Sequence, residues 1–423
     1  MDNDIYIKIP KGFKLPEANS TKPRSMYLIK LQRSLYGYKQ SGCMWYNHLS
    51  EYLLKEGYMN NPICPCIFIK KSETEFAIIT VYVDDLNLVG TPKELTRTTN
   101  YFKNEFEMKD LGKTKFCLGL QIKHFPNKVL VHQSTYIKKV LKHFYMDKAH
   151  HLSSSMRYFR LSAIGALIYL ANCIRPNILF SVNLLARYSS APTRRHLNSI
   201  KHILHYLRGT TDMSLFYSRE SKQQLLGYAD AEYLSYSYKS KSQTWYVFNY
   251  NGTTISWRSI KQIMVVTSSN HSEILAIHEA SCECIWLRSM IQHIQESCGL
   301  PSIRGNATKL HEDNVACIAQ IKLRKKCEID VQQIRSYNNL ADLFTKALPL
   351  TTLKKLRNHD QHYRLRRWRG ENGLDGSPFY CLHAAAVVEE EEEVVSVTPK
   401  SSNLTSIHAL WRRRLNIFLS FSG

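Results

Sequence analysis

The sequence predicts a mixed α/β protein with more than one domain, and three observations support this prediction. The chain has 423 residues, 44% of them hydrophobic and 11% aromatic, which is enough for two or three domains with buried cores. Segments with the composition of strands are interspersed with segments of helical periodicity. The formal net charge is +22, which indicates a polyanionic partner, with nucleic acid as the first candidate.

The first part of the chain contains an apolar segment interrupted by two adjacent carboxylates. Residues 76–90, FAIITVYVDDLNLVG, predict a β-hairpin with Asp84 and Asp85 at its tip. A plain polar turn is the ordinary explanation of such a tip. Two neighbouring carboxylates repel each other, however, and a bound divalent cation would remove that cost. Around this hairpin, the apolar spacing predicts helices at 40–57, 91–108 and 135–146.

The middle of the chain is basic over a long distance. Residues 148–211 contain nine Lys or Arg and no Asp or Glu. Residues 164–174 and 196–209 have helical periodicity, and the second segment places His196, Lys201, His205 and Arg208 near one another. We interpret the span as a surface that follows phosphates. The alternative is a solvated basic face on a helical connector.

A further α/β unit is predicted to start near residue 225. The patterns follow the order β–β–β–α–β–α–β–α over about 125 residues, which describes one compact mixed domain. Its strongest local signal is Asn251-Gly252, the preferred two-residue hairpin turn, between two strand-like runs.

Four carboxylates are distributed over this unit. Asp230 lies within a strand, Glu273 one turn into a helix, Asp313 at the end of a strand, and Asp342 in the first turn of the last helix. Glu273 follows Asn270 by three, as in a capping box, and the other two helix-proximal acids suit the helix dipole. Asp230 is the exception, because Asp is disfavoured in strands. If the elements form one sheet, the four could converge, as two-metal phosphodiester hydrolysis requires.

The eleven Cys lack the spacing of a disulfide framework, and no signal peptide opens the chain. We therefore expect a reducing, intracellular compartment, either cytoplasm or nucleus. The Cys-x-Cys pairs Cys64/Cys66 and Cys282/Cys284 lack the second pair of a zinc site, although His278 keeps a metal possible at the latter.

No membrane association is expected, since the apolar stretch at 161–174 is too short to span a bilayer. Residues after about 367 turn low in complexity and include a run of five Glu, so we expect a disordered tail.

Seven sequence blocks resemble the Pol region of copia-like LTR retrotransposons of plants, over residues 3–355. LQRSLYGYKQSGCMWY and YVDD are similar to blocks of the family's reverse transcriptase, and residues 162–210 resemble its connection segment. Four further segments resemble the four blocks of the family's RNase H domain: GYADAEY, SSNHSEILAIHEA, EDNVACIA and NLADLFTKALP. The blocks occur in the family's order.

The resemblance implies a partial reverse transcriptase palm at 1–147, a basic helical connection at 148–218, an RNase H-like domain at 219–355 and a tail at 356–423. By this resemblance Asp84 and Asp85 match the polymerase metal-binding pair. The RNase H quartet, which would hold two Mg²⁺ ions, is matched by Asp230, Glu273, Asp313 and Asp342. The implied partner is an RNA–DNA hybrid or another nucleic acid, and its phosphates would contact Arg187, Arg194, Arg195, Lys201 and Arg208.

Several departures from the family's pattern suggest a decayed, internally deleted copy. The family has a third polymerase carboxylate upstream of the block matched at 3–13, and Asp2 and Asp4 are not in its position. Cys43 stands where the family usually has Arg, and Asn177 where it has Asp. The His-containing segment before the last strand is shortened to RKKC. We therefore expect polymerase activity to be lost, and the alternatives are a non-catalytic nucleic-acid-binding remnant or an unstable product.

Overall fold

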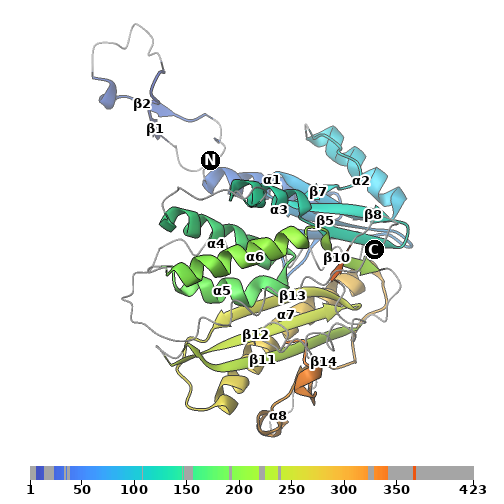
Figure 1. The fold of residues 1–423 in the computed structure, drawn as a ribbon. Coiled ribbons are helices and arrows are strands. Elements are labelled where there is room, and N and C mark those ends of the chain that lie inside the picture. Colours follow the sequence, from blue (N-terminus) through green and yellow to red (C-terminus); the bar gives the residue numbers. More distant parts are fainter. Residues whose placement is uncertain are drawn as a thin grey trace. The chain divides into compact units, whose positions relative to one another are not determined.

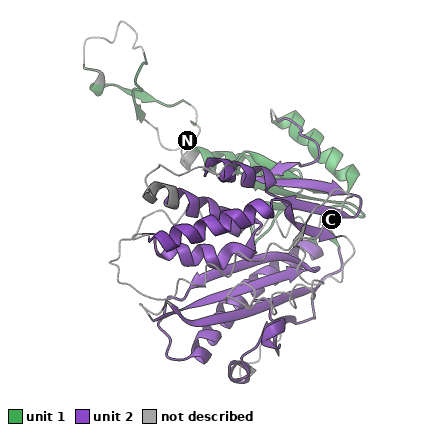
Figure 2. Ribbon diagram, in the orientation of Figure 1, with its two compact units in different colours: residues 1–107, 297–299 green, residues 108–296, 300–423 purple. Residues whose placement is uncertain are grey.

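A computed structural model describes residues 6–13, 23–32, 35, 39–106, 108–144, 146, 156–189, 193–218, 224–236, 240–322, 328–341 and 365–367. The chain divides into two compact units (Figure 2), one of residues 1–107 with 297–299 and one of residues 108–296 with 300–423. Helices and strands alternate in both, as in the mixed class that the sequence predicts. The division into four segments drawn from the sequence stays a prediction.

The first unit is built on a four-stranded antiparallel sheet with the strand order β3-β4-β5-β6. Its strands are β3 (Met59–Asn60), β4 (Ile67–Lys71), β5 (Phe76–Tyr82) and β6 (Asp85–Gly90). Two helices accompany it, α1 (Lys39–Lys55) and α2 (Pro92–Glu105), close to the ranges that periodicity predicts. The interior residues of β5 are buried on both faces. A separate ribbon pairs β1 (Tyr6–Lys8) with β2 (Leu28–Lys30), and η2 (Arg24–Met26) precedes the latter.

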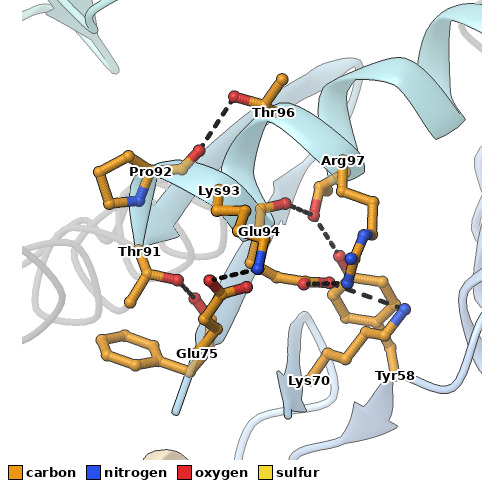
Figure 3. A network of polar contacts seen from close by, with 11 residues as sticks. Tyr58, Lys70, Glu75, Thr91, Pro92, Lys93, Glu94, Thr96 and Arg97 are labelled. Atoms are coloured by element: carbon orange, nitrogen blue, oxygen red, sulfur yellow. Dashed lines mark hydrogen bonds and ion pairs between the residues drawn. The ribbon is translucent and has the colours of Figure 1, made fainter.

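Helix α2 is fixed to this sheet by a fully buried carboxylate (Figure 3). The Glu94 side chain has no exposed surface and forms ion pairs with Lys70 of β4 at 3.7 Å and with Arg97 at 3.0 Å. The Lys70 ammonium also lies over the Tyr58 ring, 5.3 Å from its centroid. The Tyr58 hydroxyl in turn hydrogen-bonds with Thr98 at 2.6 Å. A buried charge needs such partners, and here the cations stabilise the buried carboxylate.

Replacing Glu94 with alanine should destabilise the first unit by about 1–3 kcal/mol, because the variant loses a charged hydrogen bond and leaves Lys70 beside apolar surface. Hydrogen exchange of peptides from β4 and β5 in a urea series measures this free energy locally. Glu105→Ala, at an exposed acid of the same helix, is the matched control. Equal effects of the two substitutions would assign the loss to helix propensity and not to the buried ion pairs.

The second unit contains an antiparallel sheet with the strand order β16-β10-β9-β8-β7, together with a group of helices (Figure 1). The strands are β7 (Phe116–Cys117), β8 (Leu120–Phe125), β9 (Lys128–His132), β10 (Met213–Ser218) and β16 (Leu365–Arg367). The helices are α3 (Ser134–His143), α4 (Met156–Cys173), η3 (Pro176–Ile178), α5 (Leu179–Arg187) and α6 (Arg194–Gly209). The α3, α4 and α6 segments were predicted from periodicity, whereas α5 and these strands were not.

The same unit contains a mixed five-stranded sheet with the order β13-β12-β11-β14-β15. Its strands are β11 (Leu225–Tyr236), β12 (Lys241–Tyr250), β13 (Thr253–Lys261), β14 (Thr308–Glu312) and β15 (Ile329–Gln333). The first three are antiparallel, and β11, β14 and β15 are parallel. The connections contain α7 (Ser269–Cys298) and α8 (Val315–Lys322), and η5 (Ser336–Asn338) follows β15. The predicted element order is confirmed through β15, while the last predicted helix lies largely outside the described residues.

The turn between β12 and β13 confirms the strongest local prediction. Asn251 and Gly252 both have positive φ, at 55° and 73°, as a type I′ hairpin turn requires. Edge strand β13 also contacts the helical group. The Trp257 indole donates to the Ala171 carbonyl at 2.9 Å, and the Asn183 amide donates to the Ser259 carbonyl at 3.1 Å. In the described part of the chain, no helix is both long and apolar enough to cross a bilayer.

Candidate metal centre

Three acidic side chains of the second unit converge on one point. Asp230, Glu273 and Asp313 each offer a carboxylate oxygen, and these oxygens all lie within 4.8 Å of one another. Asp230 is fully buried and Glu273 is 7% exposed. No other cluster of three or more potential metal ligands occurs among the described residues. Asp342, the fourth candidate from the sequence, lies outside them.

The sheet brings two of these residues together. Asp230 lies in central strand β11, opposite Trp245 of β12. On its other side β11 pairs in parallel with β14, with Tyr228 opposite His311. Asp313 directly follows β14. Because these two strands run in the same direction, Asp230 and Asp313, each two residues beyond the Tyr228–His311 pair, lie at the same level along the sheet.

Glu273 comes from the first turns of α7, and its helix start is well defined. Ser268 accepts a hydrogen bond from the His271 backbone N–H at 3.2 Å, so Ser268 caps the helix. The interpretation of Asn270 and Glu273 as a capping box is therefore wrong. Nearby, the Gln262 side chain donates to the Ser272 carbonyl at 2.9 Å. This hydrogen bond places the start of α7 beside Gln262, which directly follows β13.

A cap also accounts for the start of α8. Asn314 accepts from the Cys317 backbone N–H at 3.0 Å, which is the hydrogen bond of a helix N-cap. Asp313 is therefore not the capping residue, although its position suits the helix dipole. It is partly exposed, so it is the cluster member that solvent reaches most easily.

A further acid next to the cluster, itself buried, was missed at the sequence level. Glu312, the last residue of β14, is fully buried, and one of its oxygens accepts from the Asn314 backbone N–H at 3.2 Å. Burial, followed by the charges of Asp230 and Asp313, raises the pKa of Glu312 to about 9. The sequence did show that Glu312 is adjacent to the candidate ligand Asp313. The alternation of residues along a strand, however, does not by itself reveal which side chains are buried.

The cluster's chemistry suits a hard divalent cation. Carboxylate oxygens are the donors that Mg²⁺ and similar ions prefer. Three carboxylates this close together repel strongly at low solvent exposure, and a cation would offset that repulsion. The donor set of Asp230, Glu273 and Asp313 therefore fits a divalent metal ion.

The Asp84–Asp85 hairpin of the first unit has a different geometry. Val83 and Asp84 form the two-residue turn and Asp85 opens β6, opposite Tyr82. Val83 has a φ of 53°, which is rare for a β-branched residue. The Trp45 indole of α1 donates to the Val83 carbonyl at 2.9 Å and holds the turn. Both carboxylates are exposed, and in the described region neither belongs to a three-residue ligand cluster.

The basic side chains of the connection segment differ in their environments. Arg194 and Arg195 are exposed at the start of α6, and Lys201 is partly exposed further along. Arg208 is exposed but donates to the Met146 carbonyl at 3.0 Å. Arg187, at the end of α5, is half-buried. Arg194, Arg195 and Lys201 are therefore the best placed of the five to contact an external anion.

His196 does not belong to the basic surface predicted from its spacing. It is buried, forms a capping box with Thr193 and stacks on Tyr188 with ring centroids 4.4 Å apart. His205 is exposed on the same helix as Lys201 and Arg208. Partial burial and the neighbouring charges of Arg208, His202 and Lys201 lower its pKa.

Comparison with known proteins agrees with the sequence blocks. Residues 1–157 match the family of reverse transcriptases (RNA-dependent DNA polymerases). The chain is 32% identical over 320 residues to the Pol polyprotein of transposon TNT 1-94 from Nicotiana tabacum, covering 70% of this chain and 24% of the polyprotein. It is 30% identical over 311 residues to the Pol polyprotein of transposon RE1 from Arabidopsis thaliana, covering 70% and 21%.

A shorter relative is covered almost completely. The chain is 30% identical over 298 residues to a transposon Ty5-1 protein of Saccharomyces cerevisiae, covering 65% of this chain and 94% of that protein. By contrast, the chain spans about a quarter of the length of the tobacco polyprotein and less of the Arabidopsis one. The chain belongs to the family of retrotransposon reverse transcriptases.

Proposed function

We propose that residues 219–355, within the second unit, form an RNase H-type nuclease, which cleaves the RNA strand of an RNA–DNA hybrid within a copia-type reverse transcriptase polypeptide. The observation that carries this proposal is the convergence of Asp230, Glu273 and Asp313 within 4.8 Å. The mixed sheet and the four matching sequence blocks support it. Asp342 completes the quartet by resemblance.

The proposed cofactor is Mg²⁺, held by Asp230, Glu273 and Asp313. When bound at a two-metal site, such ions activate a water molecule and stabilise the leaving oxygen of a phosphodiester. The chain's own part is to hold its carboxylates in place. Asp230 is fixed in a central strand that pairs with a strand on each side, whereas Asp313 is partly exposed to solvent.

For the first unit we propose that Asp84 and Asp85 belong to a polymerase metal site. The support is their exposure at a turn that the Trp45 indole fixes from α1. A left-handed backbone at a β-branched residue is strained, and such strain is found at functional turns.

The nucleic-acid surface is proposed at the start of α6. Exposed Arg194 and Arg195 are joined there by partly exposed Lys201, and the segment 148–211 has no acid to oppose them. Phosphate contacts of this kind recognise the backbone and the shape of a hybrid, and not its base sequence.

The direct test is cleavage of an RNA–DNA hybrid in which the RNA strand is labelled. We expect nicking with Mg²⁺ and none with EDTA, and single-stranded RNA should not be cut. Purified chain without Mg²⁺- or Mn²⁺-dependent nicking would contradict the nuclease proposal. Cutting that persists in EDTA would point to a contaminating nuclease.

Hybrid affinity should fall steeply with salt, and the triple variant Arg194→Ala, Arg195→Ala, Lys201→Ala should flatten this dependence. The log–log slope changes by roughly 0.9 per phosphate contact, so the triple variant should lose about 2–3 units of slope. Fluorescence anisotropy over a salt series measures it.

The matched control removes three charges elsewhere in the same unit, at exposed Lys109, Lys113 and Lys115. It should leave the slope nearly unchanged. If both triple variants flatten the slope equally, binding depends on net charge, and the proposed α6 surface is refuted.

A further inference from the structure

The Cys-Pro-Cys segment of the first unit brings two thiols into contact. The sulfur atoms of Cys64 and Cys66 are 2.9 Å apart. A disulfide bond is roughly 2.0 Å long, so the two sulfur atoms would need to approach by only about 1 Å to reach bonding distance. Cys64 is fully buried, whereas Cys66 is partly exposed. One sulfur is therefore accessible to a reagent and the other lies directly behind it.

A tight turn creates this contact. The Ile67 backbone N–H donates to the Cys64 carbonyl at 2.9 Å, which closes a β-turn with Pro65 at its second position. Proline fixes φ at the value that this position needs. The Asn61 side chain accepts from the Cys64 N–H at 3.0 Å and fixes the residue before the turn.

Neighbouring elements hold the turn in place. The Pro65 carbonyl accepts from the Tyr46 hydroxyl of α1 at 2.7 Å and from the Asn60 amide at 2.6 Å. The Cys66 carbonyl accepts from the Val81 N–H of β5 at 2.9 Å. Since the backbone is already ordered, closing a bond between the sulfurs costs little further conformational entropy.

The other Cys-x-Cys pair is an internal comparison. Cys282 and Cys284 have the same spacing but lie in α7, where residues two apart point to different sides of the helix. Cys282 is exposed and Cys284 is buried, and burial raises the pKa of the Cys284 thiol to about 12. Identical spacing therefore gives adjacent sulfurs in the turn and separated ones in the helix.

We propose that Cys64 and Cys66 form a dithiol modification site that low-molecular-weight disulfides, such as oxidised glutathione, convert to an intramolecular disulfide. The Cys66 thiolate attacks one sulfur of the small disulfide, forms a mixed disulfide and releases one small thiolate. The Cys64 sulfur then attacks the Cys66 sulfur and expels the second small thiol. The protein loses two electrons and two protons, and the small disulfide gains them as two thiols.

The test uses the whole chain, native, in glutathione buffers of increasing oxidised fraction, followed by alkylation at low pH and tryptic mass spectrometry. Cleavage after Lys55 and Lys70 isolates residues 56–70, whose two cysteines are Cys64 and Cys66. We expect this peptide to lose two hydrogens and to escape alkylation. The peptide at 262–288 contains Cys282 and Cys284, and should stay reduced or acquire a glutathione adduct.

Variants separate the two steps. Cys64→Ser should stop the reaction at the mixed disulfide and retain glutathione on Cys66, and Cys66→Ser should prevent the two-hydrogen loss. The wild-type measurement needs no variant and stands if a variant fails to fold. The proposal is overturned if the 56–70 peptide stays reduced, if wild type accumulates the mixed disulfide, or if 262–288 forms an internal disulfide equally readily.

Discussion

Replacing Asp230 with asparagine should reduce Mg²⁺-dependent cleavage of an RNA–DNA hybrid by more than about 100-fold. Substitution of residues that merely orient metal ligands costs about 10- to 100-fold, so loss of a ligand charge should exceed that range. Asp230 is fully buried in β11, within 4.8 Å of the Glu273 and Asp313 carboxylates, so solvent offers no simple replacement for it. Single-turnover cleavage of the labelled RNA strand measures the effect.

The matched control for this substitution is Asp330→Asn, because Asp330 is also a strand aspartate of the same sheet but is exposed. It should retain cleavage close to wild type. A second readout is independent of activity. Mg²⁺ should raise the thermal midpoint of wild type by ligand linkage, and this rise should disappear in Asp230→Asn.

In EDTA the Asp230→Asn protein should be as stable as wild type or more stable, because it removes one of three repelling carboxylates. Loss of cleavage together with a large loss of stability would mean that Asp230 is needed for folding. Cleavage that survives the substitution would exclude the cluster as the catalytic site.

Replacing Glu312 with glutamine should stabilise the protein increasingly as pH rises, by on the order of 1 kcal/mol per pH unit between about pH 5 and 9. Burial, with the charges of Asp230 and Asp313, raises the pKa of Glu312 from 4.5 to about 9. In that window the folded protein keeps a proton that the unfolded chain has released. Unfolding is therefore favoured as pH rises, and a neutral glutamine lacks this dependence.

Chemical denaturation in EDTA at several pH values measures the difference in unfolding free energy between Glu312→Gln and wild type. Subtracting the unfolding free energy of wild type at each pH removes the pH dependence contributed by other groups. His132 is one of these groups, since burial and the charge of Lys123 lower its pKa. Glu296→Gln, at an exposed acid of α7, should show no such pH dependence. A difference that is constant with pH would show that Glu312 is ionised in the folded protein.

Local chemistry in the sequence was sufficient for much of the fold. Asn251-Gly252 predicted a hairpin because few other residue pairs accept two positive φ values, and both occur. Apolar spacing predicted α1, α2, α3 and α6 because each helix has one face buried against its own unit. The order of Asp230, Glu273 and Asp313 along the chain was also visible, since each belongs to a recognisable local element.

The sequence by itself did not predict pairings between distant segments. Strand β9 pairs with β10 across about 80 residues, with Leu130 opposite Phe216, and no local pattern specifies such a partner. Helix α5 was missed because its residues are largely apolar and buried, so that helical and strand patterns resemble each other.

Tertiary structure alone decided the roles of individual side chains. His196 is buried against Tyr188 although its spacing suggested a surface, and Glu312 is buried although acids usually stay in water. Two Cys-x-Cys pairs of equal spacing differ because one lies in a turn and the other in a helix. Sequence determines which groups are available, whereas burial and distance depend on what the rest of the chain packs against them.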